Sequence, residues 1–162
     1  MNGFFFDIGG VGKGRLSIGP RPRFESLQEW ADTAKRRGVN TVVSLITEDE
    51  ADRFGLDGEG NCLAQRDIDF LHFPVDDFDV PDDVRFSNLL EDLVKRLDKG
   101  QTIHAHCAGG IGRAGTLSSC ILVASGMSAA DAIATVSQAR GCDVPETDEQ
   151  VAFIVQQERL RD

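Results

Sequence analysis

One short segment holds the residue types that phosphoryl transfer requires. It reads His106-Cys107-Ala108-Gly109-Gly110-Ile111-Gly112-Arg113. A cysteine thiolate is a strong nucleophile, and an arginine guanidinium can bind two oxygens of one phosphate group. The glycines between them let the backbone curl, so that successive N–H groups can point at an anion. The spacing therefore predicts Cys107 as nucleophile and Arg113 as phosphate clamp, with the backbone of residues 108–112 around the phosphate oxygens.

The elements on both sides of this segment predict how it is held. Strands are expected in the apolar, partly β-branched segments at residues 16–18, 39–46, 68–75 and 101–106. Helices are expected at residues 24–37, 81–99, 114–125 and 128–140, with capped starts at Thr47 and Thr147. This alternation predicts an α/β fold with a central, mostly parallel sheet flanked by helices. Ligands bind at the carboxyl ends of parallel strands, so the segment that follows His106 lies where a site is expected.

Length and charge limit the remaining possibilities. The 162 residues are expected to form a single domain, residues 1–162, in which residues 1–14 are an irregular lead-in. The net charge of −10 argues against nucleic acid and anionic membranes as partners. Without an apolar run that spans a bilayer or a signal peptide, we expect a cytoplasmic protein and a monomer. No cofactor is expected, since the glycines of residues 9–14 lack the serine or threonine of a nucleotide loop.

The motif Cys-x5-Arg, preceded by His106 and set between a strand and a helix, resembles the protein tyrosine phosphatase superfamily. Residues 15–159 are similar to its compact dual-specificity type, the group of cyclin-dependent-kinase-associated and small bacterial tyrosine phosphatases. The resemblance implies the cysteine-phosphatase fold and a two-step hydrolysis. Cys107 would form a cysteinyl-phosphate that water then hydrolyses. The implied substrates are phosphotyrosine and, as an extension, phosphoserine and phosphothreonine in proteins.

The resemblance also implies an aspartic acid on a loop before the cysteine strand. Chemistry requires such an acid, because an alkoxide or phenoxide leaves poorly unless it is protonated. The matching stretch is residues 73–81, and Asp77 matches best, with Asp76 as the alternative and Asp79 as a weaker one. Asp77 is expected to protonate the leaving oxygen and then to act as the base for water.

Supporting roles follow from the same resemblance. His106 is expected to orient the loop through hydrogen bonds. Gln150 matches the second position of the family's glutamine loop, whereas Glu146 stands at the first. Ala114 stands where the family has a serine or threonine that stabilises the departing thiolate, which implies slow hydrolysis of the phosphoenzyme. Ala108 and Ile111 stand where phosphoinositide phosphatases have lysine, which favours a substrate with a single phosphate.

Two functions from other classes compete with this interpretation. One is a catalytically weak module that binds phosphopeptides, an alternative that Ala114 keeps open. The other is sulfur or arsenate chemistry on a similar, rhodanese-like loop. The acidic loop with Asp77 before the cysteine strand favours a phosphatase over the latter.

Other histidines and cysteines have simpler explanations. His104 and His106 share one strand face but lack a third ligand at suitable spacing, so we expect them in the core or behind the site, without metal. Cys120 lies in an apolar helix and is expected in the core. Cys62 and Cys142 remain open as disulfide partners for the nucleophile, because the sequence cannot place them.

Overall fold

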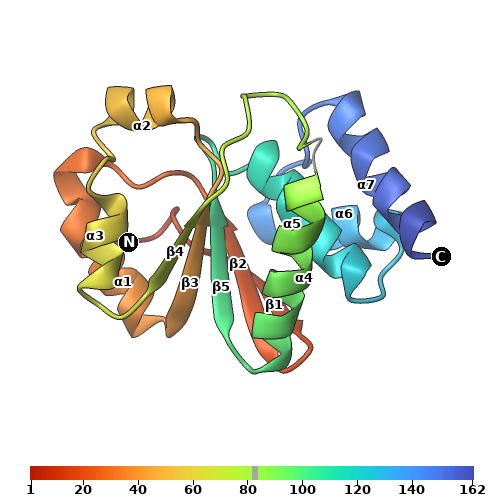
Figure 1. The fold of residues 1–162 in the computed structure, drawn as a ribbon, viewed down its shortest axis with the longest axis horizontal. Helices are drawn as coiled ribbons and strands as arrows, with labels where there is room; N and C mark the ends of the chain where they lie inside the picture. The colour runs from red at the N-terminus through yellow and green to blue at the C-terminus, as the bar shows by residue number, and fades with distance from the viewer. Residues whose placement is uncertain (82–83) are drawn as a thin grey trace.

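A five-stranded sheet forms the centre of the molecule (Figure 1). The computed structural model describes residues 1–81 and 84–162. The strands are β1 (Phe6–Val11), β2 (Gly14–Gly19), β3 (Val39–Ser44), β4 (Asp69–His72) and β5 (Thr102–His106). They lie in the order β1-β2-β5-β3-β4, and only β1 is antiparallel to its neighbour. The predicted mostly parallel sheet is confirmed, and β5 lies at its centre.

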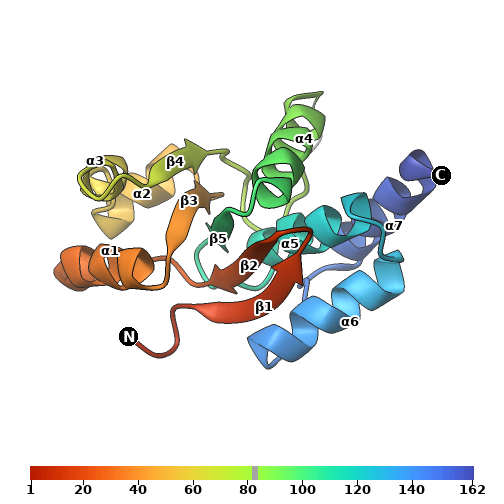
Figure 2. The ribbon, with the colours of Figure 1, turned by 90° about the horizontal axis from the view of Figure 1, so that it is seen from below.

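Helices cover both faces of the sheet, as Figure 2 shows. One face carries a 3-10 turn (Phe24–Ser26), α1 (Leu27–Arg36), α2 (Glu48–Phe54) and α3 (Glu59–Ala64). The other carries α4 (Val84–Asp98), α5 (Arg113–Ala124), α6 (Ala129–Arg140) and α7 (Asp148–Arg161). Each group buries its own apolar cluster against the sheet. This layering explains why most residues of β3 and β5 are buried, since both faces of these strands are covered.

The helices that border the site begin where the sequence signals predicted. Thr47 and Glu50 form a reciprocal capping box at the start of α2, and Thr147 and Gln150 form another at α7. The residues of α5 are buried from Arg113 to Val123, because this helix lies between β5 and the other helices of its face. The helix expected from residue 81 is described from Val84, since residues 82 and 83 lie outside the described residues.

The lead-in predicted for residues 1–14 was wrong for residues 6–11, which form β1. Val11 pairs with Gly14, so Gly12 and Lys13 make a two-residue hairpin turn. The glycines and a bulge near Gly9 hide the alternation that marks a strand, and the pairing with β2 supplies the missing hydrogen bonds. Helix α3 was also not predicted, because six residues are too few to show a helical period.

Candidate active site

Residues 107–112 connect the carboxyl end of β5 to the start of α5, at the upper edge of the sheet in Figure 1. Cys107, the predicted nucleophile, is almost fully buried at the foot of this loop. The backbone N–H of Ala114, in the first turn of α5, donates to its Sγ over 3.4 Å. Free N–H groups and the helix dipole favour negative charge at a helix N-terminus. A negative charge on the Cys107 sulfur would therefore meet a backbone donor and the positive end of the α5 dipole.

The carbonyl groups of the loop are held on its outer side. The carbonyl of Ala108 accepts from the backbone N–H of Arg21, at 3.1 Å. Those of Gly109 and Gly110 accept from the Arg140 guanidinium, both at 3.1 Å. In a trans peptide the following N–H points the opposite way, so the N–H groups of residues 109–111 face the inside of the loop. This arrangement suits an anion with several oxygens.

Two loop glycines are required by close packing. Gly110 has a φ of 71°, and a Cβ there would lie 2.3 Å from the carbonyl carbon of Gly19. A Cβ on Gly112 would lie 2.5 Å from Oε1 of Glu146. The backbone excludes a side chain at Gly110, whereas at Gly112 a side chain would require the end of the Glu146 side chain to move.

The guanidinium of Arg113 is buried and fixed by several partners. Both oxygens of Glu50 accept from it, at 2.7 and 2.9 Å, and the carbonyl of Val75 accepts at 2.7 Å. One carboxylate oxygen of Asp77 lies 3.3 Å from Nη2. Within the described residues its Nε has no hydrogen-bond partner. Arg113, the predicted phosphate clamp, is thus held rigidly beside the loop by two different segments of the chain.

Glu50 was predicted only as a helix-capping residue, and its bond to Arg113 is a second role. The hydrogen bonds from Arg113 lower the pKa of Glu50 from 4.5 to about 2, which outweighs the opposite effect of burial. The N–H and hydroxyl of Thr47 add to the stabilisation of the carboxylate. The capping box was the sequence signal for Glu50, but nothing in it pointed to Arg113.

This pair should make part of the protein's stability depend on pH. Since the pKa of Glu50 is lower in the folded chain, its contribution is complete above about pH 4.5 and is lost as pH falls towards 2. Between about pH 6 and about pH 3, the free energy of unfolding in urea should fall by about 2 kcal/mol through Glu50 in the wild type. Glu50→Gln should lack this part of the acid-dependent fall. The matched control is Glu48→Gln, an exposed residue of the same helix turn. Equal acid-dependent losses in wild type and Glu50→Gln would contradict this expectation.

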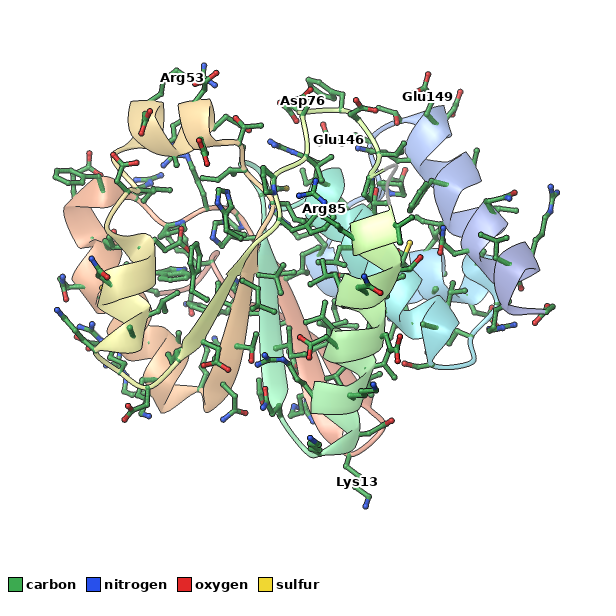
Figure 3. The ribbon with its side chains drawn as sticks, viewed as in Figure 1. Lys13, Arg53, Asp76, Arg85, Glu146 and Glu149 are labelled. Carbon is green, nitrogen blue, oxygen red and sulfur yellow. The ribbon has the colours of Figure 1, made fainter. Side chains whose placement is uncertain are left out.

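The three candidate acids lie differently on the loop that follows β4. Asp77 is the one whose carboxylate contacts Arg113. Asp79 accepts from the N–H of Val80, and Asp76 lies at the outer rim (Figure 3). Phe78 has a φ of 65°, a conformation that is costly for a bulky residue and that turns the chain sharply here. The turn lies between Asp77 and Asp79.

His106 supports the loop from below, as predicted. Its Nδ1 lies 3.3 Å from the carbonyl oxygen of Cys107, and its Nε2 lies 2.6 Å from a carboxylate oxygen of Glu59. Glu59 begins α3 and is buried, so this pair fixes the ring without contact with solvent. Sequence reasoning missed Glu59 because α3 was not predicted. His104 is also buried, and burial lowers its pKa well below the ordinary value, so its ring is neutral.

Gln150 lies close to the loop but is occupied by backbone groups. Its Oε1 accepts from the N–H groups of Glu146 and Thr147, at 3.0 and 3.2 Å. Its Nε2 donates to the carbonyl of Asp79 at 3.2 Å. The side chain therefore ties the start of α7 to the loop with the three aspartates. In this arrangement both of its polar atoms serve the structure.

The remaining cysteines are free thiols. Cys120 is in the core as predicted, and burial raises its pKa, which makes it inert. Cys62 belongs to the apolar cluster on the opposite face of the sheet from Cys107, and Cys142 is exposed. Among the described residues no group of acidic, histidine or cysteine side chains could hold a metal ion.

Comparisons with known proteins identify the family of this chain. The family model of the "Swiss Army Knife protein, DSP-PTPase phosphatase domain" matches residues 9–157. "Protein tyrosine phosphatase type IVA 3" of Bos taurus is 30% identical over 128 residues, which are 78% of this chain and 69% of that protein. "Cyclin-dependent kinase inhibitor 3" of Rattus norvegicus is 24% identical over 131 residues, 80% of this chain. The chain spans 62% of the length of that relative.

Solved structures show the same fold over nearly the whole chain. The active form of Tk-PTP has a TM-score of 0.79 and 28% identity, and covers 98% of this chain and 99% of its own. A kinase-associated phosphatase has a TM-score of 0.85 at 18% identity, with coverage of 99% and 98%. In the part of the chain that the structure describes, no helix is long and apolar enough to cross a membrane. From residue 9 to residue 157 this chain belongs to the family of dual-specificity, protein-tyrosine-phosphatase-type phosphatase domains.

Proposed function

We propose that the protein hydrolyses phosphotyrosine in proteins, and phosphoserine and phosphothreonine as further substrates, through a cysteinyl-phosphate intermediate. One observation carries the proposal: the Sγ of Cys107 receives the N–H of Ala114, beneath a loop whose carbonyl groups are bound on the outside. A phosphate there would meet inward N–H groups on one side and the thiolate on the other. Family membership supports a protein phosphatase.

The proposed reaction has two displacements at phosphorus. In the first, the Cys107 thiolate forms an S–P bond while the bond to the leaving oxygen breaks, and Asp77 gives that oxygen its proton. In the second, water attacks phosphorus, Asp77 takes back a proton, and the S–P bond breaks to restore the thiolate. Arg113 and the loop N–H groups stabilise the charge of the equatorial oxygens in both steps. Residues 108–112 thus act through their backbone.

The test measures turnover of p-nitrophenyl phosphate from about pH 5 to about pH 8. Phosphotyrosine, phosphoserine and phosphothreonine peptides are compared in the same assay. Acid-quenched enzyme should carry a phosphoryl group on the peptide that contains Cys107. Vanadate or phosphate binding without turnover and without phosphoenzyme would instead support the phosphopeptide-binding module.

Changing Asp77 to asparagine should lower kcat for a phosphotyrosine peptide about 100-fold, because the phenolic oxygen must then leave without a proton. The loss should be smaller with p-nitrophenyl phosphate, whose leaving group needs less help. Asp76→Asn is the matched control and should change little, since Asp76 lies at the outer rim. A large loss in Asp76→Asn with normal Asp77→Asn activity would make Asp76 the acid.

Changing Ala114 to serine should raise the steady-state kcat about tenfold, the effect of one added hydrogen bond to a charged sulfur. Ala114 is buried next to Cys107, and its N–H already donates to Sγ. Rapid-quench kinetics should show less phosphoenzyme at steady state in the variant. An unchanged kcat would mean that the missing hydroxyl does not limit the second step.

A further inference from the structure

A second concave surface with positive charge lies beside the phosphate loop. It is a cavity of about 380 Å³ lined by Arg21, Arg23 and Ala108, among others. The sheet explains its position: Gly19, the last residue of β2, pairs with His106 of β5. Residues 20–23 therefore leave the sheet directly next to residues 107–112, and the Arg21 N–H bonds the Ala108 carbonyl at 3.1 Å.

The two arginines of this cavity keep their charge available. The Arg21 guanidinium lies 3.8 Å from the centre of the Phe54 ring and donates to the Pro22 carbonyl at 3.1 Å. Both partners are neutral, so Arg21 is held in place without being neutralised. Arg23 is exposed, and within the described residues neither guanidinium forms an ion pair. The net charge of the protein is −10, so these two arginines give the surface beside the loop a local positive charge that the overall charge does not indicate.

A second cavity, between α2 and the loop after β4, is mainly acidic. Its volume is about 570 Å³, and five carboxylates, among them Asp49, Asp52 and Asp76, line it together with one cation, Arg53. Figure 3 shows Asp76, Glu146 and Glu149 on the same upper rim. Because carboxylates outnumber Arg53 in this cavity, a second negative group on a substrate is favoured more by the cavity of Arg21 and Arg23.

We propose that Arg21 and Arg23 form a second anion subsite, which binds a carboxylate or phosphate on a residue near the phosphotyrosine of a protein substrate. This inference rests on the proposed function and names its substrate class: acidic or doubly phosphorylated protein segments. Ala108 and Ile111 supply no extra positive charge within the loop. The positive charge that would bind a second anion therefore comes from a separate segment, residues 20–23. The acidic rim and the net charge disfavour anionic membrane lipids as the source of that group.

The test uses three phosphotyrosine peptides that differ only in the neighbouring residues, which are neutral, glutamate or phosphoserine. Wild-type kcat/KM should be about three- to tenfold higher for the two anionic peptides, and added salt should reduce the difference. Arg23→Glu should remove this preference. Lys13→Glu makes the same change in charge at the opposite end of the molecule (Figure 3) and should keep the preference.

Several results would overturn the subsite. These are equal kcat/KM values for the three peptides in the wild type, a preference that survives Arg23→Glu, or one that Lys13→Glu removes equally. Faster hydrolysis of vesicles with a phosphorylated inositol lipid would reject a protein substrate. If no peptide is hydrolysed, the proposed function fails on its own. In that case the affinities of Cys107→Ser for the three peptides are measured by fluorescence anisotropy. Tighter binding of the two anionic peptides, lost when Arg23→Glu is added, would support the subsite, and equal affinities would overturn it.

Discussion

Changing Cys107 to serine should abolish turnover of p-nitrophenyl phosphate, with a loss of at least about 10⁴-fold. A serine hydroxyl has a far higher pKa than a thiol and remains protonated where a thiol can ionise. The variant should still bind phosphate and vanadate, because the N–H groups of the loop and Arg113 are unchanged. Steady-state kinetics measures the loss, and isothermal titration with vanadate measures the retained binding.

The control for this variant is Cys142→Ser, the same change at an exposed thiol. Its activity should equal that of the wild type. Serine at position 107 can still accept the N–H of Ala114, so the melting temperature should change little. Turnover that persists in Cys107→Ser would end the cysteinyl-phosphate mechanism, whatever the affinity for vanadate.

Changing Arg113 to lysine should lower kcat/KM by about 10³-fold or more, even though the positive charge is kept. A lysine ammonium cannot bind two phosphate oxygens side by side. It also cannot replace the bidentate bond to Glu50 together with the bond to the Val75 carbonyl. The inhibition constant of phosphate should rise together with the loss in kcat/KM. Such a rise would show that the variant binds the phosphate group more weakly.

Arg161→Lys is the matched control for this variant. Arg161 also donates to two backbone carbonyls, those of Val123 and Met127, but at the far end of α7. It should lose some stability and no activity. If Arg113→Lys lost less than about tenfold in kcat/KM while phosphate inhibition stayed normal, Arg113 would not be the phosphate clamp.

The sequence alone predicted those features that depend only on residues close together in the chain. The spacing from Cys107 to Arg113 is local, because one strand end, one loop and one helix start hold all of its parts. The alternation of strands and helices predicted the parallel sheet, and the capping boxes at Thr47 and Thr147 predicted two helix starts. These signals act within a few residues, so no distant partner was needed to recognise them.

The sequence ranked the three aspartates only through the family resemblance, with Asp77 first, since they lie within four positions of one loop. The contact of Asp77 with Arg113 depends on the tertiary structure, and the left-handed angle at the next residue, Phe78, is not specified by a sequence pattern either. The strand at residues 6–11 was missed for a related reason. Its glycines carry no alternating pattern, and it depends on pairing with β2.

Only the tertiary structure brought distant side chains to the site. Glu50 meets Arg113 across 63 positions of sequence, Glu59 meets His106 across 47, and the carbonyls of the loop meet Arg140 across 30 or more. The same holds for Arg21, which reaches the loop because β2 and β5 are adjacent in the sheet but far apart in the chain. Side-chain periodicity reports which face of an element is buried, and it carries no information on which element covers that face. The proposed chemistry could therefore be predicted from residues 106–113, whereas the order of the strands decided which distant groups contact them.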